Sequence, residues 1–178
     1  MENAFQLFGL SLSPHVEVDA VETLFHQGHR STTDGSVDQE TWNRAYQTLR
    51  APSKRLRHLL ELQDISIPRN TSISEELLSL FTKVQPALAK GQSFRKEMEA
   101  AHSDLARSLL AGEQYRAQLD LQETLQSLQA AYQERLDELI DIQAEDEAAL
   151  LRLQADFTFL EKWTAQTQEE LLKFLLLD

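Results

Sequence analysis

The sequence predicts an all-α protein, and three observations support that prediction. The 178 residues include only five glycines and four prolines, too few for the many tight turns of an all-β fold. Apolar residues recur at spacings of three and four over long stretches, which places them on one face of a helix. Several of these stretches begin just after Asn, Asp or Ser, the residues that most often cap helix N-termini.

Two short helices are predicted before residue 30. Asn3 caps the first, and Gly9 ends it. The second starts after Asp19, with Glu22 as its capping-box partner, and it fades at Gly28. Their apolar residues are Phe5, Leu7 and Phe8 in the first helix and Val21, Leu24 and Phe25 in the second.

Two more short helices are predicted before residue 66. The third starts after Ser36, with Gln39 in the capping-box position. Pro52 suits the first turn of the fourth, because the N–H that proline lacks is not needed there. The apolar faces comprise Trp42, Ala45, Tyr46 and Leu49 in the third helix and Leu56, Leu59, Leu60 and Leu62 in the fourth.

Longer helices are predicted after residue 73. Ser74 caps a stretch that Pro86 kinks or ends, because proline removes a backbone hydrogen bond inside a helix. A further helix runs from about Ser93 to Ala111 and is closed by Gly112.

The two C-terminal helices are predicted from apolar stripes, one from Leu121 to Leu139 and one from Leu150 to Phe174. The acidic segment 141–147 separates them. Amphipathic helices joined by short connections favour antiparallel packing as a bundle. An extended coiled coil is the alternative, although the acidic break limits the length of its repeat.

Charge divides the chain into two parts. Residues 1–63 carry six Lys and Arg against eight Asp and Glu, whereas residues 64–178 carry eleven against twenty-one. A polar segment containing Pro68 lies near this change and is typical of a linker. We therefore predict an N-terminal domain at 1–65, a linker at 66–73 and a C-terminal helical bundle at 74–178.

Composition also excludes several classes of function. A net charge of -12 argues against nucleic-acid binding, which needs a basic surface. The lack of cysteine excludes disulfides, thiolate metal sites and a cysteine nucleophile. Phosphate-binding loops and hydrolase motifs are also missing, so we expect a protein that is not an enzyme and needs no cofactor. Without a signal peptide or a long apolar run, no membrane association and a cytoplasmic location are expected.

Several motifs resemble the HscB co-chaperones of iron–sulfur cluster assembly. The chain opens with Phe5-Gln6-Leu7-Phe8-Gly9-Leu10, similar to the aromatic and Leu-Phe-Gly-Leu of that family. The stretch 43–52, Asn-Arg-Ala-Tyr-Gln-Thr-Leu-Arg-Ala-Pro, resembles the third helix of the family's J domain. Residues 55–60 are similar to its fourth helix, and Phe159-Leu160-Glu161-Lys162 with 169–172 resembles its closing helix.

This resemblance implies an N-terminal J-like domain followed by an antiparallel three-helix bundle at 74–178, similar to the oligomerisation and scaffold-binding domain of the family. In the family, the J domain stimulates an ATPase chaperone of the HscA/DnaK type, and the bundle binds an IscU-type scaffold protein. The positions that match the scaffold-binding surface are Leu77, Leu78, Phe81 and Phe159. The family tends to have acids beside these residues, whereas Thr82 and Gln85 stand there in this chain. The alternative is a purely structural role, in which all four apolar residues pack inside the bundle.

The chaperone-binding loop departs from the family. J domains carry His-Pro-Asp after the second helix, and this chain contains no His-Pro-Asp. The matching loop contains Thr33 and Asp34, and the helix before it carries few basic residues. The corresponding chaperone-binding residues would be His26, His29, Arg30, Thr33 and Asp34. Three alternatives stay open: an HscB-type co-chaperone, a J-like adaptor that no longer stimulates a chaperone, and a helical bundle without a specific partner.

Two other groups have structural interpretations. The basic residues Arg50, Lys54, Arg55, Arg57 and His58 are predicted to form a solvated helix face, with contact to an acidic partner as the alternative. Trp42 and Trp163 are predicted to be core or interface residues.

Overall fold

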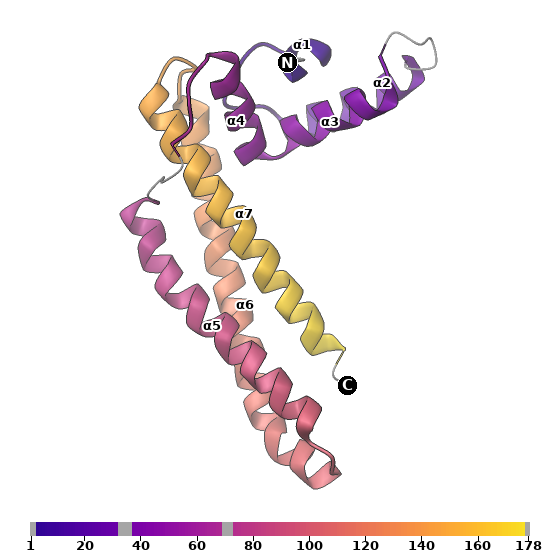
Figure 1. The fold of residues 1–178 in the computed structure, drawn as a ribbon, viewed down its shortest axis with the longest axis vertical. Helices are drawn as coiled ribbons and strands as arrows, with labels where there is room; N and C mark the ends of the chain where they lie inside the picture. Colours follow the sequence, from indigo (N-terminus) through magenta and orange to yellow (C-terminus); the bar gives the residue numbers. More distant parts are fainter. Residues whose placement is uncertain (1–2, 32–36, 69–72, 177–178) are drawn as a thin grey trace. The chain divides into compact units, whose positions relative to one another are not determined.

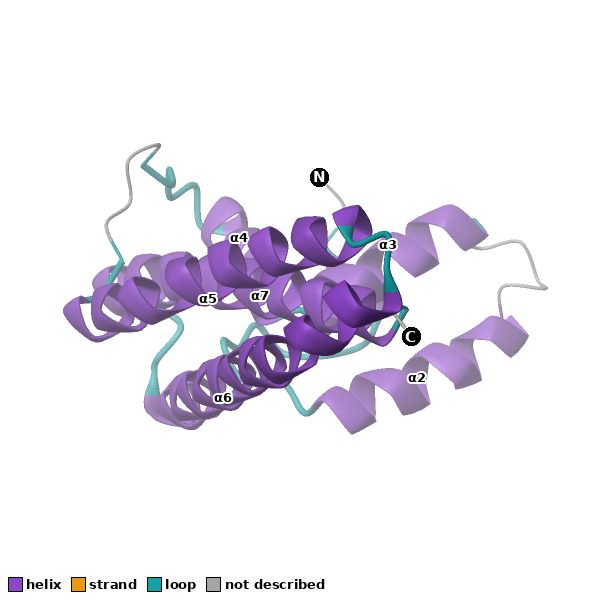
Figure 2. Ribbon diagram, turned by 90° about the horizontal axis from the view of Figure 1, so that it is seen from below, coloured by secondary structure: helices purple, strands orange, loops and turns teal. Residues whose placement is uncertain are grey.

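The computed structural model describes residues 3–31, 37–68 and 73–176, and within these ranges every regular element is a helix (Figures 1 and 2). The all-α prediction is therefore confirmed. Contacts divide the chain into two compact units, each of which is built from two stretches of the sequence. Unit 1 comprises Met1–Ser72 and Arg135–Thr158, and unit 2 comprises Ile73–Glu134 and Phe159–Asp178. The predicted functional division at residues 66–73 stays a prediction.

The N-terminal helices of unit 1 are α1 (Ala4–Leu7), α2 (Val18–Ser31), α3 (Gln39–Arg50) and α4 (Pro52–Leu62). The Asn3 side chain accepts hydrogen bonds from the backbone N–H groups of Phe5 and Gln6, which confirms it as the cap of α1. Gly9 has a φ of 66°, a left-handed conformation that glycine adopts without a steric penalty. Pro52 occupies the first turn of α4, as predicted.

Three of the predicted boundaries in this unit are wrong. Helix α2 begins at Val18 and continues through Gly28 to Ser31. Glu22, the predicted capping-box partner of α2, instead accepts a hydrogen bond from the Tyr46 hydroxyl at 3.4 Å. Helix α3 is capped by Asp38, whose carboxylate accepts a hydrogen bond from the Thr41 N–H at 2.9 Å. The predicted cap Ser36 lies outside the described residues.

Trp42 lies at the centre of the aromatic packing in this unit. Its ring stacks on Phe8 with centroids 4.2 Å apart, and its indole N–H donates to the Phe25 carbonyl at 3.3 Å. Gly28 passes so close to the ring that a Cβ built at this position would lie 2.0 Å from Trp42 Cζ2. The glycine inside α2 therefore serves close packing and does not end the helix. The prediction of Trp42 as a core residue is confirmed, because its side chain is buried.

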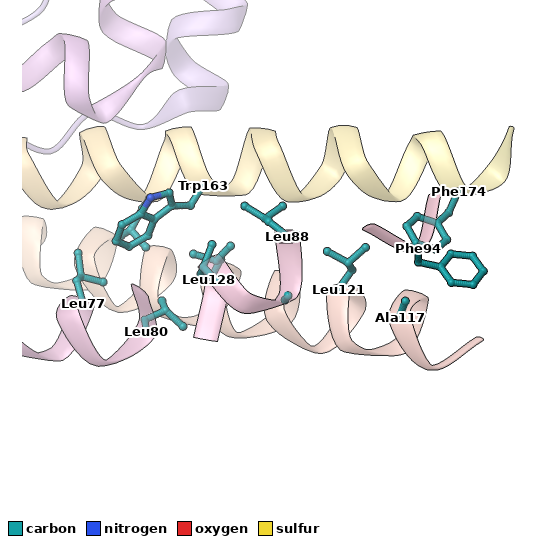
Figure 3. Packing of buried hydrophobic residues seen from close by; sticks show 12 residues of the cluster. Leu77, Leu80, Leu88, Phe94, Ala117, Leu121, Leu128, Trp163 and Phe174 are labelled. Carbon is teal, nitrogen blue, oxygen red and sulfur yellow. The ribbon is translucent and has the colours of Figure 1, made fainter. Parts of the chain in front are cut away.

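The three long helices are α5 (Glu75–Ala100), α6 (Asp104–Asp141) and α7 (Glu147–Leu175), which pack together (Figures 1 and 3). Unit 2 contains α5, the part of α6 up to Glu134 and the part of α7 from Phe159 onward. Their shared core contains Leu77, Leu80, Val84, Ala87, Leu88 and Phe94 from α5, Ala117, Leu121 and Leu128 from α6, and Leu160, Trp163 and Phe174 from α7.

Two predicted helix ends in unit 2 are also wrong. Helix α5 runs through Pro86, and the apolar stripe from Leu77 to Phe94 continues on both sides of the proline without a change of face. Burial of that stripe outweighs the hydrogen bond that proline removes. The predicted helix from Ser93 to Ala111 is divided instead, because α5 ends at Ala100 and α6 begins at Asp104.

The start of α6 is set by Ser103, whose hydroxyl accepts a hydrogen bond from the Ala106 N–H at 3.2 Å. Gly112 lies inside α6 and does not close a helix. The predicted acidic connection is confirmed, since α6 ends at Asp141 and α7 begins at Glu147. Asp146 accepts from the Ala149 N–H at 3.1 Å and caps α7.

Candidate functional site

Phe81 and Phe159, which the sequence resemblance places on one surface, meet across the same tryptophan. The Phe81 ring lies 5.3 Å from the ring of Trp163, and the Phe159 ring lies 5.6 Å from it. Trp163 is buried, whereas Phe81 is 38% exposed and Phe159 is half-buried. Leu78 is 53% exposed and lies three residues before Phe81 on α5 (Glu75–Ala100). We call Leu78, Phe81 and Phe159 the apolar patch.

Helix periodicity explains which side chains reach this surface. In α5, Leu77, Leu80 and Val84 recur at spacings of three and four and are buried, which turns the intervening Leu78 and Phe81 outward. In α7, Phe159 precedes Trp163 by four residues, so the two rings lie on neighbouring turns of one helix face. Figure 3 shows Leu77, Leu80 and Trp163 at one end of the core.

Leu77 has a different environment from the other three predicted scaffold-binding residues. Its side chain is only 2% exposed and belongs to the core cluster. Leu77 therefore supports the apolar patch from inside the unit, and the surface available to a partner consists of Leu78, Phe81 and Phe159.

Charged and polar side chains precede and follow the apolar patch along α5. Glu75 and Glu76 are exposed in the first turn of α5, and Lys83 is exposed two residues after Phe81. Thr82 is exposed and donates a hydrogen bond from its hydroxyl to the Ser79 carbonyl at 2.6 Å. The patch thus combines an apolar centre with an acidic start of helix α5, an arrangement typical of protein-binding surfaces.

The predicted chaperone-binding residues are only partly described. His26 is exposed on α2, where its ring makes an edge contact with Phe25 at a centroid distance of 5.6 Å. His29 and Arg30 belong to the last turn of α2, whereas Thr33 and Asp34 lie outside the described residues.

An open pocket of about 270 Å³ lies between α1, α3 and α4 in unit 1. Its lining includes three basic residues, Arg44, Lys54 and Arg57, together with Glu61. Arg44 pairs with Glu40 at 2.6 Å on the exposed face of α3.

The prediction that Arg55 and His58 belong to a solvated face is wrong, because both are buried. Arg55 donates to the carbonyl of Pro14 at 2.9 Å and to that of Leu49 at 2.6 Å, near the C-terminus of α3. His58 Nε2 accepts a hydrogen bond from the Ala4 N–H at 3.0 Å, which requires a neutral ring with its proton on Nδ1. Burial lowers the pKa of His58 below its ordinary value, so the ring stays neutral.

Within the described ranges, no group of three or more His, Asp or Glu side chains is arranged to hold a metal ion. No helix in the part of the chain that the structure describes is long and apolar enough to cross a membrane. No protein-family model matches the chain, and no curated protein is significantly similar to it.

Sequence reasoning missed the role of Trp163 as the residue that joins Phe81 to Phe159. The four-residue spacing between Phe159 and Trp163 was the available signal, since it predicts that the two rings share one helix face. Nothing local in the sequence indicates that Phe81 packs on the same indole, because Phe81 lies on a different helix.

Proposed function

We propose that this protein is an HscB-type co-chaperone that binds an IscU-type iron–sulfur scaffold through the apolar patch and presents it to an HscA/DnaK-type ATPase chaperone. The observation that supports this proposal most strongly is the convergence of Phe81 and Phe159 on Trp163. The two phenylalanines match the scaffold-binding positions of the family, and each of these partly exposed rings packs on the same buried indole.

The proposed fold is a J-like domain followed by an antiparallel three-helix bundle. The N-terminal Leu-Phe-Gly-Leu segment and the Asn-x-Ala-Tyr-x-Thr-Leu segment of α3 support this assignment. A binding protein of this type needs no catalytic centre and no cofactor of its own. The acidic charge suits an escort of proteins in the cytoplasm better than a nucleic-acid binder.

Isothermal titration of the full chain with a cognate IscU-type scaffold tests the proposal. We expect Leu78→Ala and Phe81→Ala to weaken binding at least about tenfold each, because apolar anchors at the centre of an interface carry most of its affinity. Leu172→Ala is the matched control, since Leu172 is 60% exposed on α7 and lies outside the patch. Circular dichroism of each variant reports whether it is folded. The absence of a heat signal at high micromolar concentration, with a folded protein, would refute the proposal.

One observation favours a second candidate function, a J-like adaptor that no longer stimulates a chaperone. The chain lacks His-Pro-Asp, and the matching stretch Thr33-Asp34-Gly35 contains no proline before its acid, whereas the ring of a proline restricts the backbone at that position in the family. An adaptor leaves the chaperone's ATPase rate unchanged, and restoring His-Pro-Asp at 33–35 raises it. A clear rise in ATPase rate with the native sequence would exclude the adaptor and favour the co-chaperone.

A further inference from the structure

Two basic residues of α4 have no role in the proposed function and no partner in the described structure. Lys54 and Arg57 are exposed, and neither side chain forms an ion pair or a hydrogen bond with any residue that the structure describes. Both line the open pocket between α1, α3 and α4, together with Arg44 and Glu61. We call this hollow the basic pocket.

The basic pocket is built by the packing of three helices. Helices α1 and α4 both contact α3 within unit 1 (Figure 1). Along α4, the spacings are three, one and three residues from Lys54 through Arg57 and His58 to Glu61, so these residues share one face of the helix. The hydrogen bond from the Ala4 N–H to His58 Nε2, at 3.0 Å, fixes the start of α1 against this face. The shape of the pocket therefore depends on the fold and not on a single exposed side chain.

The charge around the basic pocket is opposite to that of the chain as a whole. Its lining contains three basic side chains and one acidic side chain, whereas the chain has a net charge of -12. Arg44 forms an ion pair with Glu40 at 2.6 Å, but both side chains are exposed, and such surface pairs contribute at most about 1 kcal/mol. An incoming carboxylate can therefore take the place of Glu40 at little cost, so all three bases are available to an anionic partner.

The inner wall of the basic pocket is apolar. Ala4 and Ala45 line it and are buried, and Leu7 is half-buried. His58 contributes a neutral ring, because its Nε2 accepts a hydrogen bond from the Ala4 N–H and burial lowers its pKa. An occupant thus meets basic groups at the opening and apolar surface inside.

The volume of about 270 Å³ limits what the basic pocket can hold. Sites for drug-sized ligands enclose about 300 to 1,000 Å³ and bury most of the ligand, whereas this pocket is smaller and open. It has room for one large apolar side chain, and its basic opening suits carboxylates on either side of that side chain. Recognition of acidic segments by clusters of basic residues is a recurring mode of peptide binding.

We infer that the basic pocket binds an acidic peptide segment of a partner protein. One apolar residue of the segment inserts between α1, α3 and α4, and the flanking Asp or Glu residues pair with Lys54, Arg57 and Arg44. Glu61 lies one turn after Arg57 and repels carboxylates at that end, which favours placement of the acids near Lys54. The pocket shares no residue with the apolar patch, so this inference does not rest on scaffold binding.

Fluorescence anisotropy of the full chain with a labelled pentapeptide, a leucine between two pairs of glutamates, tests this inference. We expect binding with a dissociation constant below about 1 mM. Lys54→Glu and Arg57→Glu should each weaken binding at least about tenfold, because each replaces an attractive charge by a repulsive one. Lys96→Glu is the matched control, since Lys96 is exposed on α5 and the same change of charge there should leave the affinity unchanged. No binding by the wild type up to about 1 mM, or equal effects of the three substitutions, would overturn the inference.

Two further probes separate a peptide-binding site from a site for small anions. A peptide with alanine in place of the leucine should bind at least about threefold more weakly, because less apolar surface is buried. Inorganic phosphate at about 1 mM and matched ionic strength should not displace the leucine peptide, since phosphate gains nothing from the apolar wall. Equal affinity for the two peptides, or displacement by phosphate, would show a site for small anions and contradict the assignment of an acidic peptide.

Discussion

The contact between Gly28 and Trp42 makes a demanding prediction, because the two usual effects of a glycine-to-alanine substitution oppose each other at this position. Gly28→Ala replaces a helical glycine by the residue with the highest helix propensity, which alone would stabilise α2 by about 1 kcal/mol. The added Cβ, however, would lie 2.0, 2.6 and 2.7 Å from three atoms of the Trp42 ring.

The steric effect is the larger of the two. Carbon atoms need a separation of about 3.5 Å or more, so the indole would have to move by about 1.5 Å. That movement disturbs the stack of Trp42 on Phe8 at 4.2 Å and its 3.3 Å hydrogen bond to the Phe25 carbonyl. Overpacking costs about 1 to 3 kcal/mol and loss of an aromatic stack about 0.5 to 1.5 kcal/mol. After subtraction of the helix-propensity gain, we expect Gly28→Ala to lower the free energy of unfolding by about 0.5 to 3.5 kcal/mol.

Urea unfolding followed by tryptophan fluorescence measures this change. A Trp163→Phe background leaves Trp42 as the reporter, and Gln27→Ala is the matched control because Gln27 is the exposed neighbour of Gly28 on the same helix. A Gly28→Ala protein that unfolds at the same urea concentration as its parent, or at a higher one, would refute the close approach of Gly28 to the indole.

Three further predictions concern single buried side chains. Burial lowers the pKa of His58 in the folded protein, whereas the unfolded chain protonates this residue near its ordinary pKa of 6.5, so wild-type stability falls as the pH drops through 6.5 toward the folded pKa. His58→Gln should therefore flatten the pH dependence of the free energy of unfolding. Urea titrations between pH 7.5 and pH 5 measure this dependence, and the same slope in the variant and the wild type would contradict the prediction. Asp156→Ala should lower the free energy of unfolding by about 3 to 5 kcal/mol, because the fully buried carboxylate accepts a hydrogen bond from Arg135 Nε at 3.0 Å. The control Glu169→Ala removes a surface ion pair with Lys173 and should lower it by at most about 1 kcal/mol. Similar losses of stability in the two urea curves would argue against a buried pair. Leu121→Ala should cost about 2 to 5 kcal/mol by opening a cavity in the unit 2 core, and a thermal melt unchanged from wild type would show that the site is not packed.

The sequence predicted helix faces better than helix ends. Apolar stripes identified most of the buried residues of α3, α4 and α7, because burial follows the 3.6-residue period directly. Local rules predict breaks at Pro86 and Gly112, although the buried stripes of α5 and α6 pass through both without a change of face. Tertiary packing decided these positions, and local propensity did not.

Gly28 illustrates a different limit. A glycine near the end of an apolar stretch predicts a C-terminus by local rules, yet in this protein it makes room for an indole from the next helix. The partner of the glycine lies fourteen residues away, and no local pattern identifies it. Ser103, by contrast, is a local signal for the start of α6, because serine is one of the preferred N-cap residues of helices.

The apolar patch was only partly predictable. The resemblance supplied Leu78, Phe81 and Phe159, and periodicity supplied the outward position of Leu78 once the buried face of α5 was known. The sequence alone does not show that Leu77 is buried and Leu78 is exposed, because adjacent residues point about 100° apart on a helix and the buried face of α5 must be known first. The indole that joins the two phenylalanines became visible only in the folded unit.

The discontinuity of unit 1 has a practical consequence for anyone who wants to isolate the N-terminal segment. A fragment that stops at Ser72 would lack the second stretch of the unit, including Leu139, Leu150 and Phe157, which are fully buried in the intact chain, and the bond from Gln63 Nε2 to the Ala144 carbonyl at 2.8 Å. The apolar surfaces that these residues cover would then face water. The N-terminal segment is therefore not an exchangeable module, and a graft onto another bundle would have to carry the α6–α7 turn with it.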